Sequence, residues 1–435
     1  MSINPKQHLL HNHKACALVS PTASSPTRSS DRVPTYILYY LSRKSFLIKI
    51  FCSMLQVFLI TICRHKLTVD VSVGIGADVI PHIPAIFSRY PSVTDLYVRS
   101  RRESLRVSDV TLFRIAARCR NITRLNVRRC HGVTGLGLAA LARGCERLRE
   151  FSCDIVTFGS RGMNAFLNHC SSLEKLTVRS LCGTNLSDGG VVPELVGAGA
   201  AASSLKSVSL KYLYYGERFA LLIAESENLK TLKILRCFGP WDRCLETITN
   251  LNKSLVSIHL ESLQVTNVGL AAVSKCPNLE TLHLRMTPDW EMPVGEEGLI
   301  AIGKNSKNLK ELVLDGMETS ITSLSAIASG CVKLERLVLA HSERIGDPEV
   351  CCIAKKCVGL KKLCINGCLR VSDEGIEAFG SECPNLVELS MKNCRDVSGE
   401  IADWLRERRP SLAVKLDIEA DEIENEEEWD WVFRD

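Results

Sequence analysis

Apolar residues recur along the chain in one fixed frame. In VGLKKLCINGC (358–368), Leu360 is followed by Leu363 three positions later and by Ile365 five positions later. Side chains of a strand alternate between its two faces, so these residues point one way and positions +2, +4 and +6 point the other way. The frame recurs about every 27 residues. Its thirteen starts, each counted as position 0, are Val93, Ile122, Leu148, Leu173, Leu205, Leu229, Leu255, Leu279, Leu309, Leu334, Leu360, Leu386 and Leu412, the last in a frame stretched by one residue.

A helix is expected after each strand. In VSDEGIEAFGSECPNL (371–386), Ser372 is a suitable N-cap, and Ile376, Phe379 and Cys383 follow with helical spacing. A single strand–helix unit cannot bury its leucines, whereas stacked units share one continuous core. The period and the frame therefore predict an α/β leucine-rich-repeat solenoid, a horseshoe of about 13–14 repeats of the cysteine-containing type. Parallel strands are expected on its concave face and helices on its convex face.

Eleven of the 20 cysteines follow the same frame. Seven lie three residues before position 0, and four lie at position +8. A free thiol packs as a small hydrophobe, so we interpret these cysteines as core residues, including Cys368 in the pair Cys364/Cys368, and expect no metal site. Their density is too low for a disulfide scaffold, which favours the nucleus or the cytoplasm. The two sets are Cys119, Cys145, Cys170, Cys276, Cys331, Cys357 and Cys383, and Cys130, Cys237, Cys368 and Cys394.

Charge and hydropathy divide the chain into four parts. We expect a disordered basic leader over 1–33, an apolar helical segment over 34–63, the repeat domain over 64–415 and an acidic tail over 416–435. The longest apolar run, Ile50 to Cys63, has fourteen residues, which is shorter than a membrane span needs, so a membrane anchor is kept only as an alternative. The tail carries ten acidic residues against Arg434, whereas the whole chain has a net charge of +5.

Catalytic and cofactor motifs are not expected in this chain. Gly135, Gly137 and Ala140 have the spacing of a dinucleotide fingerprint, but they occupy the loop-to-helix part of an ordinary repeat. The sequence contains no nucleophile elbow and no zinc signature. We therefore predict that the protein is not an enzyme and needs no cofactor.

Several segments that repeat packing does not require resemble plant F-box/leucine-rich-repeat proteins, and in particular the VIER F-box group. The resemblance covers roughly 64–415. The strings that carry it are RHKLTVDV, IFSRYPSVTDL, RCRNITRLNVRRC, LKTLKILRCFGPWDRCLE, SLVSIHLESLQVTNVGL and GEIADWLRERRP.

The resemblance implies a substrate receptor of an SCF-type ubiquitin ligase. In such proteins an N-terminal F-box binds a SKP-type adaptor, which bridges to cullin, and the repeats present a target for ubiquitination. This sequence departs from the F-box pattern, because the acidic residues and the closing tryptophan are missing and only a few positions of the pattern are matched. The alternatives are a stand-alone interaction scaffold and a membrane-tethered repeat protein. The residues that still match the F-box pattern are Val33-Pro34, Leu38, Leu41 and Ile62-Cys63-Arg64.

The concave residues of the first repeats suggest a surface for a negatively charged target. Asp154 interrupts this basic series, and Glu261, Glu311 and Asp315 change its sign in later repeats. The expected ligand is an acidic or phosphorylated target segment, bound by arginine, or the acidic tail of the chain itself; nucleic acid is not expected. An ordinary solvated face is the alternative. The candidate binding residues are Tyr97, Arg99, Arg124, Arg128, Lys175, Arg179, Lys211, Lys233 and Arg285, with Trp241 as a further aromatic anchor.

Overall fold

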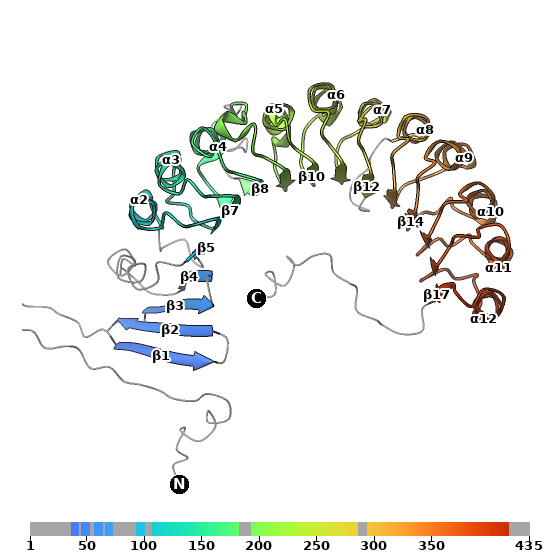
Figure 1. Cartoon of the computed structure of the whole chain (residues 1–435), viewed down its shortest axis with the longest axis horizontal. Helices are drawn as coiled ribbons and strands as arrows, with labels where there is room; N and C mark the ends of the chain where they lie inside the picture. The colour runs from blue at the N-terminus through green and yellow to red at the C-terminus, as the bar shows by residue number, and fades with distance from the viewer. Residues whose placement is uncertain are drawn as a thin grey trace, which may run out of the picture. The chain divides into compact units, whose positions relative to one another are not determined.

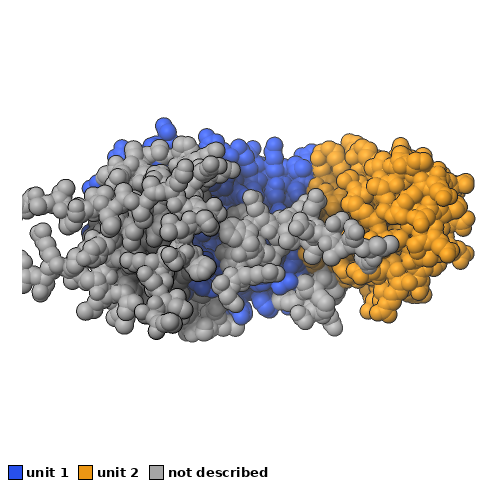
Figure 2. Space-filling model, turned by 90° about the horizontal axis from the view of Figure 1, so that it is seen from below, with its two compact units in different colours: residues 1–264, 276–278 blue, residues 265–275, 279–435 orange. Residues whose placement is uncertain are grey.

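The computed structural model describes residues 36–42, 45–52, 56–63, 66–72, 93–100, 107–181, 193–285 and 294–416. The predicted leader (1–33) and residues 417–435 of the predicted tail lie outside this part of the chain. Two compact units are present (Figure 2). Unit 1 contains residues 1–264 and 276–278, and unit 2 contains residues 265–275 and 279–435.

Each repeat frame contributes one short strand. Twelve of the thirteen strands begin at position +2. Within each unit neighbouring strands pair in parallel, with equal positions side by side except between β16 and β17, where the register is shifted by one residue. Unit 1 contains β5 (Asp95–Ser100), β6 (Arg124–Arg128), β7 (Glu150–Val156), β8 (Lys175–Leu181), β9 (Ser207–Lys211), β10 (Thr231–Leu235) and β11 (Ser257–Glu261). Unit 2 contains β12 (Thr281–Arg285), β13 (Glu311–Asp315), β14 (Arg336–Ala340), β15 (Lys362–Cys364), β16 (Glu388–Ser390) and β17 (Ala413–Lys415).

Helices cover one face of the parallel sheet in each unit, and among the described residues no helix lies on the other face, which we call the open face (Figure 1). Unit 1 contains α2 (Asp109–Arg118), α3 (Gly135–Gly144), α4 (Gly159–Leu167), η1 (Gly199–Ala201), η2 (Gly216–Phe219), α5 (Ala220–Glu225) and α6 (Trp241–Leu251). Unit 2 contains α7 (Asn267–Val273), α8 (Glu296–Asn305), α9 (Ile321–Gly330), α10 (Asp347–Lys356), α11 (Asp373–Glu377), η3 (Ala378–Gly380) and α12 (Gly399–Arg408). The protein is therefore an α/β leucine-rich-repeat solenoid, as predicted.

The predicted core positions are confirmed. All thirteen frame starts are buried, and so are the eleven cysteines of the two recurrent positions. The thiols also donate weak hydrogen bonds to neighbouring repeats: Cys368 Sγ lies 3.1 Å from the Leu339 carbonyl oxygen, and Cys394 Sγ lies 3.1 Å from that of Ile365. Burial raises the pKa of Cys368 to about 12, so its thiol stays protonated at neutral pH. These cysteines act as packing residues.

An aspartate at the start of a helix links successive repeats. Asp347 accepts a hydrogen bond from the backbone nitrogen of Ser372 at 2.8 Å and another from its hydroxyl at 2.7 Å. Asp373 binds Ser398 in the same way, with both distances 2.7 Å. Ser372 is the N-cap residue of α11, as predicted. The side chain of one repeat thus orders the helix start of the next.

Two local predictions are wrong. The described part of the segment predicted as a helix forms strands instead: β1 (Tyr36–Ser42), β2 (Ser45–Cys52) and β3 (Gln56–Cys63) pair antiparallel. β4 (Lys66–Ser72) lies between β3 and β5 and pairs with both. The sequences of β1–β3 are rich in β-branched and aromatic residues, which favour strands over helices. The frame of the last repeat is not stretched by one residue. Val414 pairs with Leu389, which is position +3 of its own repeat, yet Val414 lies only two residues after Leu412.

Candidate target-binding face

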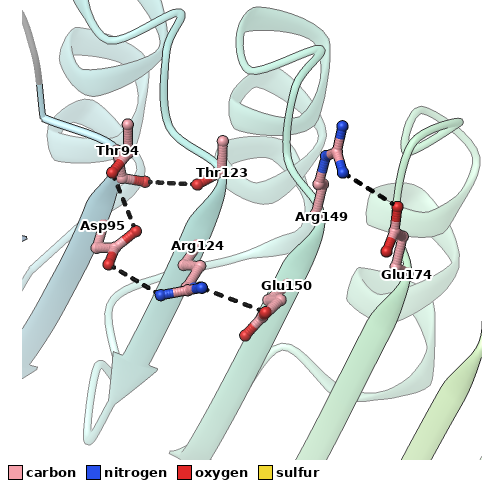
Figure 3. Close-up of polar contacts among 7 residues, drawn as sticks. All are labelled: Thr94, Asp95, Thr123, Arg124, Arg149, Glu150 and Glu174. Carbon is pink, nitrogen blue, oxygen red and sulfur yellow. Dashed lines mark hydrogen bonds and ion pairs between the residues drawn. The ribbon is translucent and has the colours of Figure 1, made fainter.

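Charges alternate along position +2 of the open face over the first four strands of unit 1, β5–β8. Arg124 lies between two acidic side chains of the neighbouring strands, 3.2 Å from Asp95 and 3.3 Å from Glu150 (Figure 3). Position +1 follows the same rule, since Glu174 accepts from Arg149 at 3.4 Å and from Lys206 at 3.2 Å. Opposite charges on adjacent strands stabilise the sheet, so these positions mainly balance one another.

Position +6 holds a more tightly packed ionic cluster. The Asp154 carboxylate lies 3.0 Å from Arg128 and 3.9 Å from Arg179, with the side chains of Asp154 and Arg128 only 12% and 8% exposed. Burial raises the pKa of Asp154, although the arginines around it act in the opposite direction. Burial also lowers the pKa of Arg128, against the attraction of Asp154 and together with repulsion from Arg99. For both Asp154 and Arg128, the effect of desolvation on the pKa is therefore larger than the effect of their mutual attraction.

Beyond Asp154, an aromatic ring separates two arginines. The Arg179 guanidinium carbon lies 4.8 Å from the centre of the Tyr212 ring, and that of Arg236 lies 5.6 Å from it. Both distances are within cation–π range. Arg236 also forms an ion pair with Glu261 at 3.1 Å.

An exposed aromatic pair lies two positions after Tyr212 and Arg236. The rings of Tyr214 and Phe238 stack at a centroid distance of 5.1 Å and an angle of 8°. Tyr214 is 56% exposed and Phe238 is 40% exposed. We define the Tyr212 edge as Arg179, Lys211, Tyr212, Tyr214, Arg236 and Phe238.

Ten of the thirteen repeats have a left-handed backbone at position +7, at or just beyond the end of the strand. The φ angle is 54° at Tyr212 and 51° at Arg236, and the same conformation recurs in both units. The backbone nitrogen of this residue donates to the position +6 carbonyl of the next repeat, as Tyr212 does to Leu235 at 3.0 Å. A non-glycine residue here costs roughly 1–2 kcal/mol. The residues concerned are Arg129, Ile155, Ser180, Tyr212, Arg236 and Ser262 in unit 1, and Gly316, His341, Gly367 and Asn393 in unit 2.

The structure separates the predicted binding residues into groups. Arg99, Arg128, Arg179 and Lys211 occupy position +6 of unit 1, and Tyr97 and Lys233 occupy position +4. Arg124 is balanced by two carboxylates, and Lys175 occupies the same alternating column. Arg285 belongs to unit 2, where it forms an ion pair with Asp315 at 2.6 Å.

Trp241 is not an exposed anchor, and that expectation is wrong. Its side chain is fully buried at the start of α6, and its ring nitrogen donates to the Cys237 carbonyl oxygen at 3.0 Å. The aromatic residues that do reach the surface, at positions +7 and +9, were missed. The alternation of a strand assigns no face to residues beyond its end, so only the string YLYYGERF (212–219) hinted at them.

Clustered metal-ligating side chains and long apolar helices are both absent from the described residues. That part of the chain contains no group of three His, Cys, Asp or Glu side chains suited to a metal ion. None of its helices has the length and apolar character to cross a bilayer.

Comparisons with known proteins point to one class of plant protein. No family model matches the chain. A transport inhibitor response 1-like protein of Oryza sativa subsp. japonica is 26% identical over 274 residues, which are 54% of this chain and 43% of the relative. Putative F-box/LRR-repeat protein 23 of Arabidopsis thaliana is 28% identical over 30% of each chain. F-box protein SKIP19 of Arabidopsis thaliana is 29% identical over 26% of this chain and 37% of the relative.

These matches cover less than half the length of the relatives. The protein is similar to plant F-box/leucine-rich-repeat proteins at modest identity. Among solved structures, the yeast Rad7–Elc1 complex contains a chain that aligns with 78% of this chain and 88% of its own length, at 16% identity and a TM-score of 0.48.

Proposed function

We propose that this protein is a non-enzymatic, target-recognition subunit of an SCF-type ubiquitin ligase, of the VIER F-box group, and that it binds its target through the open face of unit 1. The similarity to plant F-box/leucine-rich-repeat proteins supports the ligase role. The observation that carries the binding role is the Tyr212 edge, where exposed aromatic rings lie among guanidinium groups. Tyrosine and arginine are the residues most enriched among the energetic centres of interfaces.

The proposed partners are a SKP-type adaptor, cullin and a target with an acidic or phosphorylated segment. The proposed compartment is the nucleus or the cytoplasm, where thiols stay reduced, and the support for it is the free state of the cysteines among the described residues, most of which are buried.

Co-expression of the full chain with a SKP-type adaptor tests the ligase role. We expect the two proteins to co-elute in size-exclusion chromatography, and a chain that starts at residue 64 to lose the adaptor. Failure of the full chain to co-elute with any SKP-type adaptor would contradict this role.

The second candidate is a stand-alone interaction scaffold. One observation favours it: β1–β4 pair with one another in chain order and β4 pairs with β5, so these four strands extend the sheet of unit 1. A chain that binds peptides but no adaptor would match this candidate.

A further inference from the structure

We infer that the Tyr212 edge binds an anionic peptide segment that carries an aromatic side chain. This inference deepens the proposed function and rests on it, because the segment would belong to the protein that unit 1 recognises. Three features of the described residues lead to it: a surplus of positive charge, an exposed aromatic group, and side chains at backbone positions that disfavour them.

Positive charge is concentrated where the strands of unit 1 end. Positions +6 and +7 of β5–β11 carry six cationic side chains and only two acidic ones, Asp154 and Glu261. Position +2 of the same strands alternates in sign over β5–β8, is uncharged in β9–β11, and so attracts no particular charge. Anionic groups are therefore drawn to one margin of the open face. The six cations are Arg99, Arg128, Arg129, Arg179, Lys211 and Arg236.

The aromatic group lies within this positive margin. Tyr214 and Phe238 stack on each other and remain exposed, and Tyr212 is held between Arg179 and Arg236. An aromatic side chain of a ligand can pack against such rings while neighbouring carboxylates reach the guanidinium groups. A purely acidic ligand would leave the rings in water, so the ligand is expected to carry both chemistries.

The backbone supplies the third feature. Tyr212 and Arg236 occupy left-handed positions, where unit 2 has Gly316, His341, Gly367 and Asn393. Glycine, asparagine and histidine tolerate this conformation better than tyrosine or arginine. The larger side chains stand at these positions at a conformational cost, which points to a role outside the packing of the repeat.

A peptide fits this margin better than a nucleic acid strand. Single-stranded nucleic acid needs a continuous basic groove along its backbone, with rings on which successive bases stack. Here Asp154 and Glu261 interrupt the positive series, and the exposed rings lie in one place.

Selection from a random 12-residue peptide library against the immobilised full chain tests the inference. We expect the recovered peptides to be enriched in Asp and Glu and to share one aromatic residue. A recovered peptide with a fluorescent label should then bind the Tyr212→Gly and Phe238→Ala variants at least tenfold more weakly than the wild-type chain. His341→Gly, which changes the same repeat position in unit 2, is the matched control and should bind unchanged.

Further peptides and an oligonucleotide identify the ligand chemistry. Replacing each Glu by phosphoserine distinguishes phosphate from carboxylate recognition, and tighter binding of either form supports an anionic ligand. Equal binding of a Gln version, no recovered peptides, or full binding by Tyr212→Gly would overturn the inference. Tighter binding of a single-stranded oligonucleotide at the same residues would also overturn it.

The two proposals fail separately. Loss of adaptor co-elution with intact peptide binding rejects the ligase role and leaves the peptide site standing. Adaptor binding without selection of acidic, aromatic peptides rejects the site alone. Tyr212→Gly relieves a left-handed backbone, so it should remain folded; thermal melting checks this, and Arg236→Gly serves as a second variant with the same expected loss of binding.

Discussion

Units 1 and 2 use the same backbone at position +7 but fill it with different residues. The φ angle ranges from 46° at Ser180 to 70° at Gly316. Unit 2 places residues there that adopt this conformation readily, whereas unit 1 includes Ile155 and Tyr212, which do not. The conformation is therefore imposed by the repeat, while the choice of side chain reflects what that side chain contacts. In unit 1 those contacts include the arginines around Tyr212.

The two units also differ in how they surround an aspartate at position +6. Asp154 of unit 1 pairs with Arg128, whose side chain is buried. Asp315 of unit 2 binds Arg285 and His341, which are 49% and 66% exposed. Loss of the Asp154 carboxylate would leave the buried Arg128 without this partner in unit 1. Loss of the Asp315 carboxylate would leave Arg285 and His341 of unit 2 exposed to water. The cost of losing the same residue type should therefore differ between the units.

Replacement of Asp154 by alanine is expected to have the largest effect on stability. It should lower the free energy of unfolding by about 3 kcal/mol, because Arg128 stays buried beside Arg99 without this carboxylate. Asp315→Ala should cost only about 1 kcal/mol, since its partners return to water. Hydrogen exchange followed by mass spectrometry can compare β7 with β13 in each variant.

The double variant Arg128→Met/Asp154→Leu provides the control. It removes both charges and should recover most of the loss, because desolvation opposes this buried pair. Equal costs for Asp154→Ala and Asp315→Ala would contradict the difference between the units.

Exchanges at position +7 should have a smaller effect. Gly316→Ala places a side chain at a φ of 70° and should lower the free energy of unfolding by about 1 kcal/mol. Gly367→Ala should cost more, because its new Cβ would lie 2.9 Å from the His341 ring. Tyr212→Gly should stay within about 1 kcal/mol of the wild type, since relief of strain offsets lost contacts.

Urea unfolding curves measure these changes. A loss of more than about 2 kcal/mol for Tyr212→Gly would mean that this residue is held for packing, and the contrast between the units would lose its functional meaning.

Acidification should affect the units differently. Glu388 of unit 2 accepts hydrogen bonds from Lys362 and Lys415, which lower its pKa from 4.5 to about 2. A lowered pKa means that the stabilisation is present above about pH 4.5 and is lost as the pH falls towards 2. Because both lysines are half exposed, we expect a loss of about 1 kcal/mol. Asp154 of unit 1 differs in direction, because burial raises its pKa, so its titration does not follow the sign worked out for Glu388.

The pH dependence of hydrogen exchange in β16 checks this expectation. Glu388→Gln should remove the dependence between pH 4.5 and 2 at β16, and should leave β7 as it was. An unchanged profile at β16 in the variant would assign the acid response to other carboxylates.

The repeat core was predictable because each position recurs. Leu205 and Leu334 have no special neighbours in sequence, yet the frame that contains them predicts their burial, and both are buried. The cysteines were predictable for the same reason, since Cys145 and Cys383 share one position and one environment. A single short apolar run does not determine which of its residues are buried, whereas the same run repeated in thirteen frames does.

The binding face was less predictable because it depends on neighbours across strands. Arg124 looks like part of a basic series along the chain, but Asp95 and Glu150 occupy the same position in the adjacent repeats. Comparison of all residues at position +2 would have shown the alternation. The left-handed backbone at position +7 is a property of how the strand ends, and the residues of unit 1 give no sign of it.

Replacement of Arg124 by alanine should have the smallest effect and separates the two interpretations of the basic residues. Its side chain is 54% exposed, and exposed ion pairs contribute little, so the free energy of unfolding should change by less than about 0.5 kcal/mol. If position +2 only balances charge, selected peptides should bind this variant as tightly as the wild type, whereas Arg236→Ala should weaken binding. Fluorescence anisotropy with one peptide measures both variants. A similar loss for both would extend the binding surface across the whole open face of unit 1, and the Tyr212 edge would then be one part of a broader electrostatic surface.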